Sequence, residues 1–276
     1  MSPRYTGMLA LSAASVLALI LVAAEDKQAS PLPRAHAHND YEHKRPLLDA
    51  LEQGFCSVEA DVYLVGEELL VGHTRRDLRP ERTLEKLYLA PLKDRIRANG
   101  GRVYREGPAF YLMIDVKSEA KATYAAIDKQ LARYGDMLSV TRDGKFQAGA
   151  VTVVISGNRA QETITRQKVR YAGIDGRPAD LDSEAPAHLM PWISSSWGSL
   201  FRWKGDGPMP AAERDKLKEI VGKAHKHGRK VRFWATPEKP EVWKELFAAD
   251  VDFLNTDRLV ELRRFLLEHD ASPKRR

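Results

Sequence analysis

The chain is poor in cysteine and lacks the motifs of several common protein classes. Its single cysteine, Cys56, cannot form a disulfide within the chain, so the fold must be stabilised by a hydrophobic core. No glycine-rich phosphate loop follows the first predicted strand, which argues against a nucleotide-binding open sheet. The sequence contains no internal repeat and no nucleic-acid-binding motif, so we expect no nucleic-acid partner.

Only one long apolar run is present, at residues 8–24, and a single basic residue, Arg4, precedes it. This layout is typical of a secretory signal peptide over residues 1–24, and an uncleaved membrane anchor is the alternative. We therefore expect an exported protein, periplasmic or extracellular, which stays membrane-anchored if the segment is retained. Residues 25–33 read as a linker and residues 271–276 as a basic tail.

The composition fits one large globular domain. The chain has 276 residues, of which 43% are hydrophobic, and it carries a formal net charge of +6. Apart from the tail and residues 223–230, the basic residues are scattered, as on an ordinary solvated surface. We expect a monomer.

Extended and helix-like segments alternate along the rest of the chain. The predicted strands are residues 34–38, 57–64, 110–116, 151–156, 169–174, 189–194, 231–235 and 251–255. The predicted helices are residues 46–53, 83–98, 119–134, 160–166, 211–227, 240–248 and 259–269, with a weak one near 178–183. Eight such units predict an α/β protein, a (β/α)8 TIM barrel over residues 34–270, with a doubly wound sheet as the alternative. A hairpin insert is expected at residues 138–149.

The second predicted strand carries two carboxylates on one face. Glu59 and Asp61 are two residues apart, and in a strand this spacing points both side chains to the same side. Neighbouring carboxylates repel each other and resist burial, unless a hard divalent cation such as Mg²⁺ or Ca²⁺ takes their oxygens as ligands. The pair therefore predicts a site for one divalent cation.

Further polar residues fall at the carboxyl ends of the predicted strands, where barrel enzymes build their active sites. His38 ends the first strand, Asp115 and Lys117 end the third, and His73 follows a short extended stretch after the second. Asp115 adds a third carboxylate, and Lys117 offers positive charge to a phosphate oxygen. The two histidines titrate near neutral pH and can act as acid and base. The set predicts cleavage of a phosphodiester.

The order of these motifs resembles the phospholipase-C-like and glycerophosphodiester phosphodiesterase superfamily. The matching pattern is His38, Glu59-x-Asp61, Val71-Gly72-His73, Ile114-Asp115-Val116-Lys117, Phe233-Trp234-Ala235-Thr236 and residues 251–258. The stretches at residues 36–41 and 46–51 are similar to its altered-inheritance-of-mitochondria branch.

This resemblance implies an irregular TIM barrel with divalent-metal phosphodiesterase chemistry. It implies that His38 and His73 form the acid–base pair and that Trp234 lies in the substrate wall. It also implies that Glu59, Asp61 and Asp115 bind the metal. The substrate would be a small-molecule or lipid phosphodiester, such as a glycerophosphodiester or a phospholipid head-group bond, and a lipid substrate would bring transient contact with a membrane surface.

The chain departs from the usual pattern at the first motif and at the third carboxylate. His38-Asn39-Asp40 stands where glycerophosphodiesterases usually carry His-Arg-Gly, and Asp115 stands in place of a glutamate. Asp115 with Lys117 resembles the sphingomyelinase-D-type toxins, whose catalytic-loop disulfide one cysteine cannot supply. The substrate therefore stays open at this point.

Two other functions remain open. A barrel that binds a phosphorylated head group without cleaving it would carry the same residues. An amidohydrolase-type metal hydrolase would use His36 and His38 as a His-x-His motif, but His188, His225 and His227 precede their strands, at the wrong end for further ligands. We therefore expect His36 to pack one layer below the site or to support the residues that form it.

Overall fold

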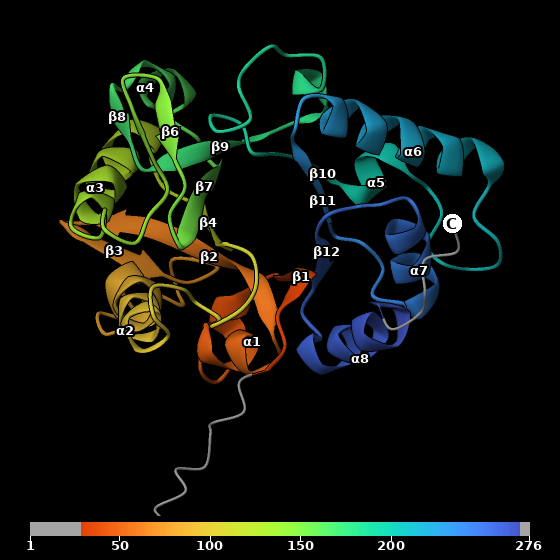
Figure 1. Cartoon of the computed structure of the whole chain (residues 1–276), viewed down its shortest axis with the longest axis horizontal. Helices are drawn as coiled ribbons and strands as arrows, with labels where there is room; N and C mark the ends of the chain where they lie inside the picture. Colours follow the sequence, from red (N-terminus) through yellow and green to blue (C-terminus); the bar gives the residue numbers. More distant parts are fainter. Residues whose placement is uncertain (1–28, 271–276) are drawn as a thin grey trace, which may run out of the picture.

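Eight parallel strands form the centre of the molecule, and helices lie around them (Figure 1). The computed structural model describes residues 29–270, so the predicted segment at residues 1–24 and the tail at residues 271–276 lie outside the described residues. The barrel strands are β1 (Leu32–Ala37), β2 (Phe55–Val65), β4 (Phe110–Val116), β7 (Val151–Gly157), β9 (Ala172–Gly176), β10 (Trp192–Ser196), β11 (Lys230–Trp234) and β12 (Leu254–Thr256).

The strands are paired in the order β11-β10-β9-β7-β4-β2-β1-β12, which places the two ends of the series next to each other. A parallel bridge between Arg232 and Phe253 joins β11 to the segment that enters β12. The amide of Phe253 donates to the carbonyl of Val231 at 3.1 Å. The predicted TIM barrel is confirmed, and the open-sheet alternative is wrong.

The helices that follow the strands cover the outside of the barrel. They are α1 (Leu48–Glu52), α2 (Ala90–Ala98), α3 (Ala120–Ala132), α4 (Gln161–Arg166), α5 (Trp197–Leu200), α6 (Ala211–Lys226), α7 (Pro240–Ala248) and α8 (Leu259–Asp270). Short turns add η1 (Asp40–Glu42), the π-helical η2 (Glu85–Leu89) that runs into α2, and η3 (Pro178–Asp180). No helix within residues 29–270 is long and apolar enough to cross a membrane.

Side chains alternate between the outside and the inside of each barrel strand. On β2, Val58, Ala60 and Val62 are buried in the main hydrophobic core, whereas Glu59 and Asp61 point to the other face. Helix α3 starts where the Glu119 carboxylate accepts from the amides of Lys121 and Ala122, an N-terminal cap for its first turn.

Four short strands of the described chain lie outside the barrel. β3 (Glu68–Val71) pairs antiparallel with the end of β2, whereas β5 (Val140–Arg142) and β6 (Lys145–Gln147) form the expected hairpin insert. β8 (Val169–Arg170) joins this hairpin, so the predicted strand at residues 169–174 is divided between two sheets. The sixth barrel strand starts at Trp192 rather than at residue 189, because the preceding residues bond to Ile174 and to the turn at Pro186.

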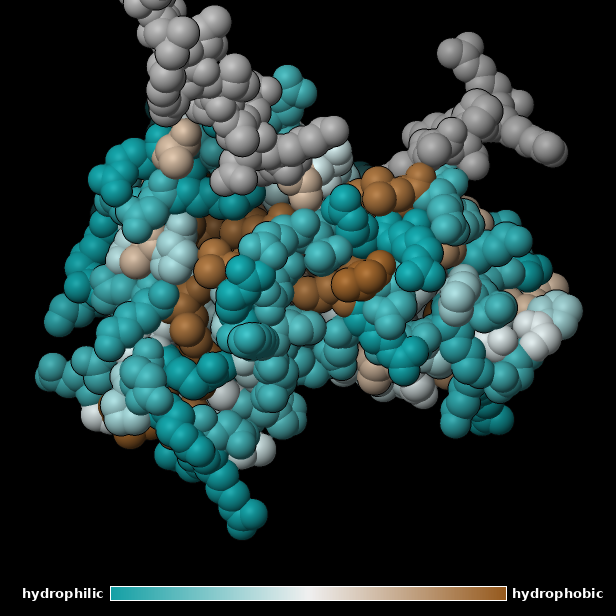
Figure 2. Space-filling view, turned by 90° about the horizontal axis from the view of Figure 1, so that it is seen from below, coloured by the Kyte–Doolittle hydropathy of each residue, from teal (hydrophilic) through white to brown (hydrophobic). Residues whose placement is uncertain are grey.

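Two kinds of surface are visible in the space-filling view from below (Figure 2). Hydrophilic residues cover most of this face, and hydrophobic residues show through in separate areas between them. Scattered apolar exposure of this kind is ordinary for a folded domain and identifies no site.

Candidate active site

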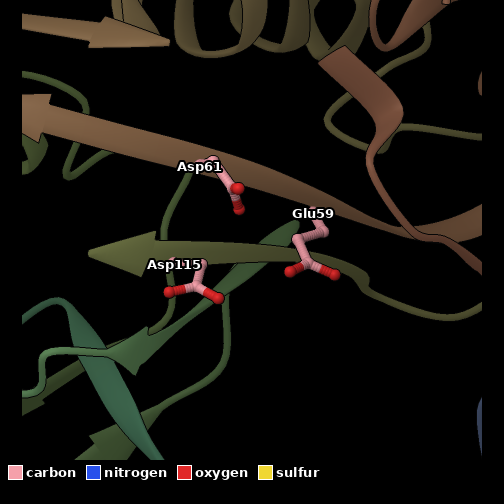
Figure 3. Close-up of side chains that lie close together, drawn as sticks. All are labelled: Glu59, Asp61 and Asp115. Carbon is pink, nitrogen blue, oxygen red and sulfur yellow. The ribbon is translucent and has the colours of Figure 1, made fainter. Parts of the chain in front are cut away.

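Three carboxylates meet at the carboxyl ends of β2 and β4. Glu59 and Asp61 are both on β2, and Asp61 pairs in register with Asp115 on β4. One oxygen from each side chain lies within 4.8 Å of the others (Figure 3). Glu59 and Asp61 are 4% and 1% exposed, so two negative charges are held almost out of water. This arrangement requires a compensating positive charge.

Two buried oxygens in this cluster have no hydrogen-bond donor. Oδ1 of Asp61 and Oδ1 of Asp115 lack a partner among the described residues. Space beside Asp115 is left by Gly157, where a Cβ atom would lie 1.9 Å from Oδ1 and where φ is +65°. Unpaired carboxylate oxygens in one place are the donor set that a hard cation requires, so the site fits Mg²⁺ or Ca²⁺ chemically.

The mutual repulsion of the carboxylates appears in their pKa values. Burial and the charges of Glu59 and Asp115 raise the pKa of Asp61 to about 6. Burial and the charge of Glu59 also raise the pKa of Asp115. A bound cation would reverse both effects, because it favours the ionised form of each group.

Lys117 supplies one positive charge at the edge of the cluster. Its Nζ lies 3.1 Å from Oδ2 of Asp61 and 3.1 Å from Oδ2 of Asp115. The amide of Lys117 donates to the carbonyl of Val62, which fixes the end of β4 against β2. Burial alone would lower the pKa of Lys117, but Asp115 and Asp61 raise it, so the ammonium stays charged. Its side chain is 26% exposed and faces the cleft.

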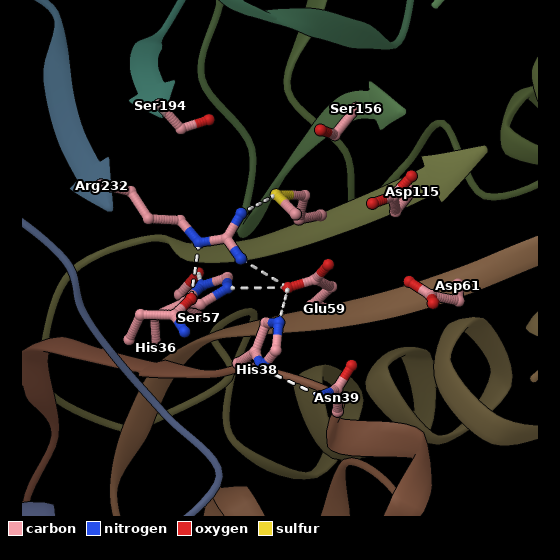
Figure 4. A network of polar contacts seen from close by, with 12 residues as sticks. His36, His38, Asn39, Ser57, Glu59, Asp61, Asp115, Ser156, Ser194 and Arg232 are labelled. Atoms are coloured by element: carbon pink, nitrogen blue, oxygen red, sulfur yellow. Dashed lines mark hydrogen bonds and ion pairs between the residues drawn. The ribbon is translucent and has the colours of Figure 1, made fainter. Parts of the chain in front are cut away.

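Arg232 supplies a second positive charge, and the sequence reasoning did not identify it. Its Nη2 donates to Oε2 of Glu59 at 2.6 Å (Figure 4). Its Nε donates to Oδ1 of Asn255 at 2.8 Å. Burial alone would raise the pKa of Glu59, but Arg232 and then His36 hold it well below its usual range. A signal was present, since Arg232 and Trp234 are two residues apart on β11 and share its inward face.

His38 follows β1, and a carboxylate holds its ring. Its Nδ1 lies 2.8 Å from Oδ1 of Asp257, which also accepts from Nδ2 of Asn39 at 3.3 Å. Its Nε2 lies 3.9 Å from Oε2 of Glu59. Burial alone would lower the pKa of His38, but the hydrogen bond with Asp257 and the charge of Glu59 raise it. Asp257 was part of the sequence motif but had no role assigned to it.

His73 lies on the other side of the cluster, directly after β3. Its Nδ1 is 3.2 Å from Oδ2 of Asp61 and 3.2 Å from the hydroxyl of Tyr41. The Tyr41 hydroxyl donates to the same oxygen of Asp61 at 2.7 Å. The side chain of His73 is 59% exposed, so one edge of its ring is open to a ligand.

All seven residues predicted for the site line one cleft. The cleft has a volume of about 460 Å³, and its lining includes His38, Glu59, Asp61, His73, Asp115, Lys117 and Trp234. The polar lining also includes Asn39, Tyr63, Ser156, Asn158, Arg177 and Arg232. A cleft with converging titratable groups at the carboxyl end of a barrel is the arrangement expected of an active site.

His36 lies beneath the cleft, as expected. It is fully buried, its Nδ1 is 2.7 Å from the hydroxyl of Ser57, and its Nε2 is 3.6 Å from Oε2 of Glu59. Burial and the charge of Arg232 lower the pKa of His36 to about 3. Its ring packs edge-on against Trp192 in the barrel interior. This position does not fit the metal ligand of an amidohydrolase-type site, so that alternative loses its support.

Solved structures of similar fold define the class of barrel. A glycerophosphodiester phosphodiesterase from Parabacteroides distasonis aligns with a TM-score of 0.56 and 16% identity, over 88% of this chain and 100% of that one. A calcium-dependent phosphoinositol-specific phospholipase C from a Pseudomonas species aligns with a TM-score of 0.50 and 12% identity, over 84% and 88%. The chain has the fold of the phospholipase-C-like phosphodiesterase barrels.

Sequence comparisons then identify the family. Residues 26–174 match the AIM6-like phosphodiesterase domain, and residues 230–259 match the glycerophosphoryl diester phosphodiesterase family. Altered inheritance of mitochondria protein 6 from Eremothecium gossypii is 33% identical over 85% of this chain and 69% of its own length. Its homolog from Arthroderma benhamiae is 29% identical over 82% and 81%. The chain belongs to the AIM6-like phosphodiesterase family.

The predicted export is corrected by these relatives. They are named for the inheritance of mitochondria, as is the Saccharomyces cerevisiae protein that is 28% identical over 86% of this chain, and not for export. The apolar run on which the prediction rested lies outside the described residues. Hydropathy near the start of a chain marks targeting segments of several kinds, so the run alone did not determine a destination.

Proposed function

We propose that the chain is a divalent-metal-dependent phosphodiesterase that cleaves a glycerophosphodiester or a phospholipid head-group bond. The observation that carries this proposal is the three-carboxylate cluster, with its two buried unpaired oxygens, flanked by two histidines and a lysine in one cleft. Residues 34–270 would form one catalytic domain, acting as a monomer.

Glu59, Asp61 and Asp115 would hold one Mg²⁺ or Ca²⁺. When bound, such a cation stabilises negative charge on the phosphoryl oxygens and lowers the barrier to displacement. Calcium is a reasonable first choice in assays, because one protein of the same fold is named as calcium-dependent. Arg232 occupies Oε2 of Glu59, so this carboxylate would offer its other oxygen.

His38 is suited to take a proton from the nucleophile. Asp257 accepts from its Nδ1, which leaves Nε2 free as the basic nitrogen, and the same carboxylate stabilises the imidazolium that forms. Nε2 lies on the Glu59 side of the ring, next to the cluster.

His73 would then give a proton to the leaving oxygen as the phosphorus–oxygen bond breaks. Its exposed ring lies across the cluster from His38 and contacts Asp61 and Tyr41. Lys117, between Asp61 and Asp115, would hold a non-bridging phosphate oxygen, and Trp234 would form part of the wall around the head group. Water as the nucleophile gives an open phosphomonoester, whereas a neighbouring substrate hydroxyl gives a cyclic phosphate.

Phosphorus NMR tests this proposal directly. The purified chain is given a mixture of glycerophosphodiesters, lysophospholipid and sphingomyelin, with Ca²⁺, with Mg²⁺ or with chelator. We expect metal-dependent loss of at least one diester resonance, and the product shift identifies a cyclic or an open phosphate. His73→Ala should lower turnover by about 10²–10⁴-fold, the usual contribution of general acid–base catalysis.

His227→Ala is the matched control, because His227 follows α6 at the opposite end of the barrel from the cleft. Full turnover in the His73→Ala variant would remove His73 from the mechanism. If every resonance persists while the folded protein still binds Ca²⁺, the proposed cleavage of these diesters is wrong and the head-group-binding alternative is favoured.

A further inference from the structure

Both aromatic rings in the lining of the cleft already carry an arginine. The guanidinium of Arg177 lies over the ring of Trp234, with its carbon 5.2 Å from the ring centroid. The guanidinium of Arg75 lies over the ring of Tyr63 at 5.5 Å. Trp234 and Tyr63 are the only Trp, Tyr or Phe side chains among the described residues that line this cleft. A ligand ammonium that approaches either ring would lie near a cation that already occupies one of its faces.

The Arg177 side chain is held firmly in this position. Its Nη1 donates to Oδ2 of Asp175 at 2.5 Å and to the carbonyl of Gly176 at 3.0 Å, and its Nη2 lies 3.3 Å from the hydroxyl of Ser156. Asp175 is fully buried and also accepts from Ser156 and Ser194. The negative end of this ion pair is therefore inside the barrel, and the positive end faces the cleft.

The carboxylates in the described lining of the cleft are all proposed metal ligands, so none is free to bind an ammonium group. Among the described residues in its lining, the acidic ones are Glu59, Asp61 and Asp115, the three that would hold the cation. Asp257, outside this lining, is engaged with His38. Proteins recognise quaternary ammonium groups through aromatic faces, and a free carboxylate attracts the same positive charge. In this cleft a guanidinium occupies one face of each ring, and the carboxylates in the described lining are those that would hold the metal.

We propose that the site selects head groups without positive charge. On this proposal, which rests on the proposed function, the substrate is a phosphodiester whose head group is a polyol or carries a further negative charge. The Arg177 guanidinium donates hydrogen bonds to oxygen atoms of that head group. Arg75 and Arg177 together repel the positive charges of choline and ethanolamine. An ammonium bound against either ring would lie closer to the arginine on that ring than the Debye length, which is about 10 Å at 0.1 M salt. Salt would therefore screen their repulsion only in part.

A head-group competition tests the proposal in the full-length protein. With Ca²⁺ present, kcat/KM is measured for glycerophosphoinositol and glycerophosphoglycerol against glycerophosphocholine and glycerophosphoethanolamine. Binding of inositol 1-phosphate and of phosphocholine is measured in parallel by calorimetry, since neither is a diester to be cleaved. We expect at least about a tenfold preference for the uncharged or anionic head group in both readouts, a factor that ordinary pocket contacts supply.

Variants assign the preference to the arginines. Arg177→Gln should reduce the ratio to within about threefold, Arg75→Gln should have a smaller effect, and Arg177→Lys should keep most of the discrimination because it keeps the charge. Arg76→Gln is the matched control, since Arg76 is an exposed neighbour of Arg75 that lies over neither ring of the cleft. Circular dichroism checks that each variant is folded, and the ratio in the unaltered protein tests the proposal even if Arg177→Gln does not fold.

The outcomes separate this proposal from the proposed function. Equal or tighter handling of the choline compounds by the unaltered protein overturns the head-group selection, even if diesters are cleaved. An unchanged ratio in folded Arg177→Gln overturns the role of Arg177. If no diester is cleaved but inositol 1-phosphate still binds at least about tenfold more tightly than phosphocholine, the selection stands and the catalytic proposal fails.

Discussion

The two ends of the barrel interior are filled with opposite kinds of side chain. At the amino end, Trp192, Phe253 and Tyr111 pack against one another, with ring centroids 4.8–5.7 Å apart. At the carboxyl end, the inward-facing side chains include the three carboxylates of Glu59, Asp61 and Asp115. Burial of the aromatic layer raises the free energy of unfolding, whereas burial of the acidic layer lowers it.

The largest effect on stability is expected at the amino end. Trp192 is fully buried and contacts Phe253, Tyr111 and His36, so Trp192→Ala should lower the free energy of unfolding by about 3–5 kcal/mol. Urea denaturation measures this loss. Activity per folded molecule should stay close to that of the unaltered protein, because the rings lie below the cleft.

Trp192→Phe is the control, and it should cost less because it keeps an aromatic ring. A Trp192→Ala protein with unchanged stability would show that the aromatic layer is not what supports the barrel.

Arg232 connects the two ends, and its replacement should affect both. The guanidinium donates to Glu59 above and contacts Sδ of Met113, at 3.1 Å, below. Arg232→Met leaves Glu59 buried without its main partner, which should cost about 3 kcal/mol of unfolding free energy. The loss should be smaller with Ca²⁺ bound, because the cation gives the carboxylate a new partner.

Urea denaturation with Ca²⁺ and with chelator measures both values. Arg258→Met is the control, since the Arg258 side chain is 60% exposed and pairs only with Glu238 among the described residues. An equal loss in the two variants would mean that the buried pair has no special role.

The pattern along each strand was enough to predict most of this site. Alternation with a period of two predicted that Glu59 and Asp61 share one face of their strand, as do Asp115 and Lys117. The carboxyl ends of the strands in a TIM barrel meet at one end of the barrel, so these two pairs were expected to lie close together. The pairing of Arg232 with Glu59 joins residues 173 positions apart in the sequence, and alternation gives only the face on which Arg232 lies.

Trp234 shows where such reasoning stops. Its inward direction follows from the strand pattern, but its ring is covered by Arg177, which comes from the loop after β9. Loop positions follow no period, so neither this contact nor that of Asp257 with His38 could be read from the spacing of the residues.

Binding of a cation should stabilise the acidic end in particular. With Ca²⁺ at 100 times its dissociation constant, the unfolding free energy should rise by about 2.7 kcal/mol, because the cluster exists only in the folded chain. Thermal denaturation with Ca²⁺ and with chelator measures the difference. Asp115→Asn should remove most of it, whereas Asp128→Asn, on the outer helix α3, should not.

The stabilisation by Ca²⁺ should also depend on pH. Without a cation the pKa of Asp61 is raised to about 6, so protons compete with the cation below that pH and its affinity should fall. Stabilisation by Ca²⁺ that is unchanged between pH 7 and pH 5 would contradict a role for Asp61 in binding it.

The smallest effect is expected at the edge of the site, where Asp257 holds His38. The carboxylate raises the pKa of His38, so Asp257→Asn should lower that pKa. It should also reduce kcat/KM at neutral pH by about tenfold, the effect of losing one hydrogen bond to a charged group. If His38 is the base, it must be neutral in the free enzyme, and a lower pKa keeps it neutral to lower pH. The acid limb of the profile of kcat/KM against pH should therefore shift to lower pH. If His38 is instead the acid, the basic limb should shift to lower pH, and the roles of the two histidines are exchanged.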